Sequence, residues 1–218
     1  MQLNFIVCME VTCNETERNA LLSFKHRLSD PSKRLSSWSD ADDCCRWMGV
    51  RCNNITGRVM ELDLSTPLDS PYMQLSDLQR NQLSGALPDS LDQLKHLEVL
   101  DLSNNTIVHS VPSTFSNLSS LRTLNIGHNQ LNGTIPESLG FLRNLQVLNL
   151  GANSLTGGMS ATLGILSNFV TLDLSSNCLE GPIQEKSLEK LFELKEPRLP
   201  STNVFLNVES SWTPVFLT

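Results

Sequence analysis

A fixed interval of 24 residues separates five asparagines in this chain: Asn81, Asn105, Asn129, Asn153 and Asn177. Leucine keeps the same interval at Leu100, Leu124, Leu148 and Leu172. A period of this size predicts a stack of similar supersecondary units, each burying its apolar face against its neighbours. The first question about function is therefore which face of an elongated stack meets a ligand.

The repeating unit matches L-x-x-L-x-L-x-x-N-x-L, the pattern of leucine-rich repeats. We expect the L-x-x-L-x-L part to form a short parallel strand with its leucines inward and the other residues on a concave face. Each asparagine then turns the chain at the strand's end. Its inward amide can bond backbone groups of its own turn and of the next repeat, which if buried unpaired cost about 1–3 kcal/mol each. We therefore interpret the five asparagines as a structural ladder.

Four of the six cysteines lie in the first quarter of the chain: Cys13, Cys44, Cys45 and Cys52. Such a group forms either a zinc site or two disulfides. Adjacent Cys44 and Cys45 point their side chains apart in extended backbone, which suits two bridges better than one tetrahedral metal. Disulfides place the chain in an oxidising compartment. Cys8 and Cys178 stand apart, and we interpret Cys178 as a small filler residue rather than a reactive thiol.

The segment that carries these cysteines differs from the repeats. Its apolar residues predict a helix over 15–28, which Asp30 and Pro31 end. Two tryptophans follow, Trp38 and Trp47. A solenoid needs a cap over its first repeat, so we expect both rings to be buried there. The alternative is that the rings bind sugar.

We divide the chain into four regions. We expect residues 1–12 to be a leader or signal-peptide remnant, 13–58 the cap, 59–193 the repeats, and 194–218 a degenerate, truncated repeat without a C-terminal cap. The apolar residues near Met1 follow no basic residue, so this segment does not match the usual pattern of a signal peptide. No run approaches 18 apolar residues, and we expect no membrane span.

After the ladder asparagine the repeats read L-x-G-x-I-P, as over 131–136. This element resembles the plant-specific leucine-rich-repeat class, and the resemblance implies a second small sheet along the flank. The cap resembles that of plant receptor-like proteins, receptor kinases and polygalacturonase inhibitors, which implies bridges Cys13–Cys44 and Cys45–Cys52. The segments 57–64 and 196–216 look most like receptor-like proteins of the xylanase-elicitor-receptor branch. The expected fold is an α/β repeat solenoid, a right-handed superhelix with a disulfide-bonded helical N-terminal cap.

The candidate ligand-binding residues are those at the outward positions of the strands. Acids, amides and β-branched residues occur among them. They include an acidic and amide column, beside a column that contains Val99. The alternative interpretation is a solvated face that any such sheet needs for solubility. The candidates are Asp77, Arg80, Glu98, Val99, Asp101, Asn104, Arg122, Asn125, His128, Gln146, Asn149 and Asp173.

Composition and motifs exclude several classes of function. A net charge of −7 argues against nucleic acid as a partner. The four histidines are scattered without metal-ligand spacing, and no catalytic signature is present. We therefore expect no enzyme, no cofactor and no metal. Five sequons, about as many as chance gives, mark possible N-glycosylation at Asn14, Asn54, Asn104, Asn117 and Asn132.

The predicted function is non-catalytic recognition, as an ectodomain fragment of a plant receptor-like protein in defence or developmental signalling. The expected location is extracellular or at the plasma membrane. The expected partners are a peptide, protein or glycan ligand and a co-receptor kinase. One alternative is a secreted inhibitor of pathogen cell-wall hydrolases, similar to polygalacturonase inhibitors. Another is a truncated gene product with no independent activity.

Overall fold

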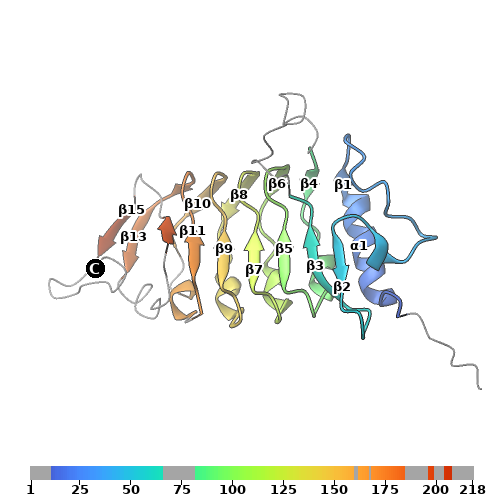
Figure 1. Ribbon diagram of the computed structural model, residues 1–218. Helices are drawn as coiled ribbons and strands as arrows, with labels where there is room; N and C mark the ends of the chain where they lie inside the picture. Colours follow the sequence, from blue (N-terminus) through green and yellow to red (C-terminus); the bar gives the residue numbers. More distant parts are fainter. Residues whose placement is uncertain are drawn as a thin grey trace, which may run out of the picture.

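The computed structural model describes residues 11–65, 82–159, 162–166, 168–184, 196–198 and 204–207. Within these residues the chain forms an elongated stack, with the helical cap at one end and successive strands side by side along it (Figure 1). Residues 1–10 of the expected leader, which include Cys8, lie outside the described residues, as do Asp77, Arg80 and Asn81.

A seven-stranded sheet runs the length of the stack in the order β14-β11-β9-β7-β5-β3-β2. Neighbours from β3 to β14 are parallel and in register, so that Leu100, Leu124, Leu148 and Leu172 lie opposite one another and are fully buried. β2 pairs antiparallel with β3. The strands are β2 Val50–Cys52, β3 Val59–Asp63, β5 Val99–Asp101, β7 Thr123–Asn125, β9 Val147–Asn149, β11 Thr171–Asp173 and β14 Glu196–Arg198.

A second, six-stranded sheet follows the L-x-G-x-I-P segments in the order β1-β4-β6-β8-β10-β12, which confirms the flanking sheet implied by the resemblance. β1 pairs antiparallel with β4, and the rest are parallel. A separate parallel pair joins β13 and β15. These strands are β1 Leu28–Ser29, β4 Ser84–Ala86, β6 Thr106–His109, β8 Gln130–Thr134, β10 Ser154–Gly157, β12 Cys178–Leu179, β13 Gly181–Gln184 and β15 Val204–Asn207.

Short 3₁₀ turns complete each repeat. They are η2 Asp89–Gln93, η3 Ser113–Asn117, η4 Glu137–Phe141 and η5 Leu163–Ile165. Proline is the N-cap of the first three, because its fixed φ suits the extended residue that ends the preceding segment. Leucines and phenylalanines from strands and turns meet in one continuous core along the stack.

The ladder asparagines bond the backbone of successive repeats. The Asn129 Nδ2 donates to Leu102 O at 3.0 Å and to Ile126 O at 3.1 Å, while its Oδ1 accepts from Ile107 N–H at 3.0 Å. Asn105, Asn153 and Asn177 make the corresponding bonds. Each amide therefore satisfies polar groups that the core would otherwise leave unpaired.

The cap closes the first repeat on both sheets. Helix α1 (Glu15–Arg27) is capped by the Asn14 side chain and packs against η2. β1 and β2 pair with the first strands of the two sheets. Trp38 and Trp47 stack with ring centroids 5.2 Å apart and are only 1% and 2% exposed. Burial this complete rules out the sugar-binding alternative.

Candidate recognition surface

The outward side of the seven-stranded sheet, here called the strand face, is the surface on which the candidate residues meet. Val99, Thr123, Val147 and Thr171 lie in register on four adjacent strands and are each half-buried. We call these four residues the middle row. Neighbouring strands are about 4.8 Å apart, so the row offers a continuous strip of methyl and hydroxyl groups.

A second line of side chains, the outer row, lies one residue before the middle row. It consists of Glu98, Arg122 and Gln146. The Arg122 Nε lies 3.5 Å from Glu98 Oε2, with the side chains 54% and 35% exposed. An ion pair this exposed contributes little stability, about 0–1 kcal/mol. Both charges can therefore exchange partners at low free-energy cost.

The acidic and amide column, here the amide row, is engaged within the protein. Asp101 Oδ1 accepts from the Ser103 N–H at 3.0 Å and Oγ–H at 2.7 Å, and Asp101 Oδ2 accepts from Asn125 Nδ2 at 2.8 Å. Asn149 Oδ1 accepts from Gly151 N–H at 3.0 Å. Asp173 Oδ1 accepts from the N–H and hydroxyl of Ser175. These four side chains hold the turn after each strand, so they offer a ligand fewer groups than the sequence suggested.

The last candidates lie just before the ladder. Asn104 and His128 adopt φ values of 57° and 54°, in the left-handed region. Asn104 is half-buried, whereas His128 is exposed. Of the predicted residues, the structure thus brings the outer row, Val99 and His128 onto one accessible surface.

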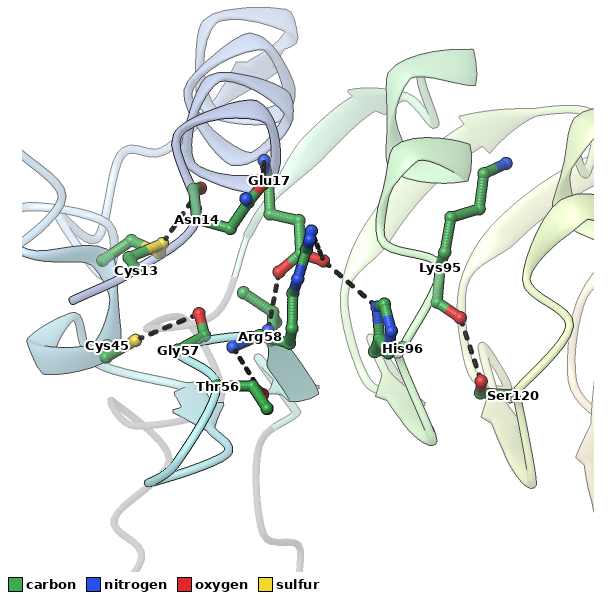
Figure 2. A network of polar contacts seen from close by, with 12 residues as sticks. Cys13, Asn14, Glu17, Cys45, Thr56, Gly57, Arg58, Lys95, His96 and Ser120 are labelled. Atoms are coloured by element: carbon green, nitrogen blue, oxygen red, sulfur yellow. Dashed lines mark hydrogen bonds and ion pairs between the residues drawn. A yellow bond between two sulfur atoms is a disulfide. The ribbon is translucent and has the colours of Figure 1, made fainter. Parts of the chain in front are cut away.

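Sequence reasoning missed a buried carboxylate between the cap and the first repeats (Figure 2). The Glu17 side chain is 1% exposed, and its Oε2 accepts from Val59 N–H at 2.7 Å. The Arg58 Nη1 and the His96 Nδ1 lie 3.5 Å and 3.6 Å from Glu17 Oε1. The signal was present, because Glu17 precedes Ala20, Leu21 and Phe24 by three, four and seven residues and so lies on the same helix face.

The disulfides Cys13–Cys44 and Cys45–Cys52 confirm the pairing implied by the resemblance, with Cα atoms 5.5 Å and 5.4 Å apart. The physical premise about the adjacent cysteines was wrong. Cys44 and Cys45 belong to a 3₁₀ turn, η1 (Cys44–Arg46), and not to extended backbone. The turn brings their side chains together, so that all four Sγ atoms lie within 4.8 Å of one another. Cys178 is exposed and carries a free thiol, so it is not a core filler.

The sequon asparagines differ in exposure. Asn54, Asn117 and Asn132 are exposed, whereas Asn104 is half-buried. The Asn14 side chain accepts from Glu17 N–H at 3.3 Å as the α1 cap. Glycosylation of all five remains a prediction.

Two family models match the chain. The leucine rich repeat N-terminal domain matches residues 14–53, and the leucine rich repeat matches residues 77–131 and 97–155. A chain in the crystal structure of the BIR3–SERK2 complex from Arabidopsis thaliana superposes with a TM-score of 0.70 at 31% identity, over 88% of this chain and 95% of that one. The chain belongs to the plant leucine-rich-repeat family.

Several curated relatives are receptor-like proteins. Receptor-like protein EIX2 of Solanum lycopersicum is 48% identical over 59 residues, which are 27% of this chain and 6% of that protein. Receptor-like protein 50 of Arabidopsis thaliana is 33% identical over 117 residues, 44% of this chain and 13% of that protein. The chain therefore spans only a small part of these relatives.

Another similar structure is the Arabidopsis receptor kinase HAESA in complex with the peptide hormone IDA and the co-receptor SERK1. It superposes with a TM-score of 0.63 at 36% identity, over 88% of this chain and 34% of that one. Leucine-rich-repeat ectodomains of this family are non-catalytic. Among the described residues, no helix is long and apolar enough to cross a membrane.

Proposed function

We propose that this chain is a ligand-recognising part of a plant receptor-like ectodomain, acting outside the cell in defence or developmental signalling. Its ligand is an extended peptide or protein segment that crosses the strands over the middle row. The observation that carries the proposal is the register of Val99, Thr123, Val147 and Thr171 beside the exposed outer row.

The chemistry of the two rows favours a peptide with both apolar and charged groups. The middle row supplies methyl groups for apolar side chains and hydroxyl groups for backbone amides. Beside it, half-buried Glu98 and exposed Arg122 present opposite charges, so one ligand group of each sign has a partner. Arginine is well suited here because its planar guanidinium binds a carboxylate through two parallel hydrogen bonds.

Two comparisons support this kind of ligand. HAESA, which is similar in fold and 36% identical over the aligned part, binds the peptide hormone IDA and the co-receptor SERK1. Several of the curated relatives are receptor-like proteins. A co-receptor kinase is accordingly a second proposed partner for the full-length protein.

The proposal is tested with a phage-displayed peptide library panned against the purified chain. The selected peptides are titrated by biolayer interferometry against the native chain and the variants Arg122→Ala and Val147→Arg. Both changes should weaken binding by at least about tenfold, equivalent to roughly 1.4 kcal/mol. Arg143→Ala, an exposed arginine outside the strand face, is the matched control and should change affinity less than about twofold.

If Arg122→Ala and Arg143→Ala lost the same affinity for the peptides, the strand face would not be the binding surface. If no peptide is enriched while an oligosaccharide array gives specific binding that Arg122→Ala removes, the ligand is a glycan and the peptide assignment is wrong.

A further inference from the structure

We propose that the reduced cap binds one Zn²⁺ through Cys13, Cys44, Cys45 and Cys52. In the oxidised chain these residues form the two disulfides described above. In a reducing environment, or before the disulfides form, the same four sulfurs would hold the cap together through the metal. The proposed site is independent of ligand recognition on the strand face.

Distances between the sulfurs carry this inference. All four Sγ atoms lie within 4.8 Å of one another. A tetrahedral Zn²⁺ with four thiolates at about 2.3 Å places its sulfurs roughly 3.8 Å apart. After reduction, side-chain shifts on the order of 1 Å would therefore bring the four sulfurs into the positions of four ligands of one ion. The fold need not change.

The backbone around the cluster is held by bonds that do not depend on the disulfides. Asp43 Oδ1 accepts from the N–H groups of both Cys13 and Cys45, each at 3.0 Å. The 3₁₀ turn η1 fixes Cys44 beside Cys45, and Cys52 lies on β2, which pairs with β3. Reduction therefore leaves hydrogen bonds that keep the four residues close, which lowers the entropy lost when a metal binds.

The surroundings favour a cation and provide a route to the cluster. A cavity of about 310 Å³ opens beside it, lined by Cys13 and Asp43 and by the further acids Glu15, Asp40 and Asp42, with one arginine, Arg18. Such a concentration of carboxylates raises the local concentration of cations.

Reduction of the two disulfides requires an external reductant. A water-soluble phosphine attacks one sulfur of each disulfide, the S–S bond breaks, and water supplies the oxygen of the phosphine oxide and the protons of two thiols. Two phosphines thus convert the two disulfides into four thiols. Zn²⁺ then displaces the four thiol protons to solvent and forms four Zn–S bonds, because the thiolate is the metal-binding form.

The test uses the full 218-residue chain, reduced with phosphine under anaerobic conditions, with Co²⁺ as the spectroscopic probe. We expect one Co²⁺ per chain with the visible d–d absorption of a tetrahedral thiolate site, and its loss when Zn²⁺ displaces it. Zn²⁺ should also raise the Tm of the reduced chain, because metal affinity stabilises the folded state. The oxidised chain should show neither effect.

Variants separate the cluster from other thiols. Cys52→Ser should weaken Co²⁺ binding by at least about tenfold, the range produced even by loss of an outer-shell partner. Cys178→Ser is the matched control, since it removes the exposed thiol and keeps the cap cysteines. The proposal would be overturned if the tetrahedral absorption did not appear, or if both variants lost the same Co²⁺ affinity. Metal binding by the oxidised chain would overturn it as well. A Tm unchanged by Zn²⁺ would do so too, because binding to an unfolded cap gives no protection.

Discussion

At the scale of single residues, buried amides decide stability. Asn129 is 9% exposed and bonds the backbone of its own turn and of its neighbours. Replacement by alanine leaves these buried groups unpaired, and we expect unfolding free energy to fall by about 3 kcal/mol. Asn132→Ala, three residues on but exposed, should change it by less than about 0.5 kcal/mol. Urea unfolding followed by circular dichroism measures both, and similar losses would show that the ladder position has no special role.

Another residue-scale prediction concerns backbone strain at His109. Its φ is 68°, and at the corresponding position other repeats have Gly85, Gly133, Gly157 and Gly181, also with positive φ. A side chain is unfavourable in this region, so His109→Gly should stabilise the chain by about 0.5–1 kcal/mol despite the greater freedom of unfolded glycine. The reverse change, Gly133→Ala, should destabilise it by a similar amount. In thermal unfolding, we expect the stability to rise in His109→Gly and to fall in Gly133→Ala. A loss of stability in His109→Gly would contradict the prediction.

At the scale of elements, Glu17 links helix α1 to strand β3. The Arg58 and His96 side chains are 38% and 52% exposed, so solvent screens their contacts with Glu17, and the bond to buried Val59 N–H matters most. Glu17→Ala leaves that N–H unpaired and should cost about 2–3 kcal/mol. Glu17→Gln keeps an acceptor oxygen and should cost less than about 1 kcal/mol. Urea unfolding monitored by tryptophan fluorescence compares the two, and equal losses would show that charge, not the acceptor, is important.

The cap also allows a prediction for its two disulfides. Cys13–Cys44 closes a sequence separation of 31 residues and Cys45–Cys52 one of 7. In the loop-entropy model, removing the longer bridge costs about 4 kcal/mol and the shorter about 2.5 kcal/mol. The double variants Cys13→Ser/Cys44→Ser and Cys45→Ser/Cys52→Ser, unfolded in metal-free buffer, should show this order. The reverse order would mean that native packing at the shorter bridge outweighs chain entropy.

The strands and turns of the repeats could be predicted because the sequence is periodic. Strand, turn and ladder positions repeat every 24 residues, so each is observed several times in one chain. Features that occur once were harder to predict. The antiparallel strands β1 and β2 come from non-periodic sequence, and the turn η1 contradicted the extended backbone assumed for Cys44. The amide row looked like a ligand surface because residue type alone does not say that Asp101 bonds Ser103.

At the scale of the whole molecule, each repeat contacts mainly its two neighbours, so a defect should stay local. Leu124 is fully buried in β7, between β5 and β9. Its replacement by alanine should cost about 3–5 kcal/mol through lost burial and a cavity. In a stack with nearest-neighbour coupling, amide protection should fall most in β5, β7 and β9 and least in the cap strand β2. Hydrogen–deuterium exchange with mass spectrometry resolves these segments.

The matched control is Leu62→Ala, because Leu62 is buried in β3 beside the cap. This change should move the loss of protection to β2 and β5. A uniform loss in both variants would mean that the stack unfolds as one unit, because only then does the position of the cavity not matter.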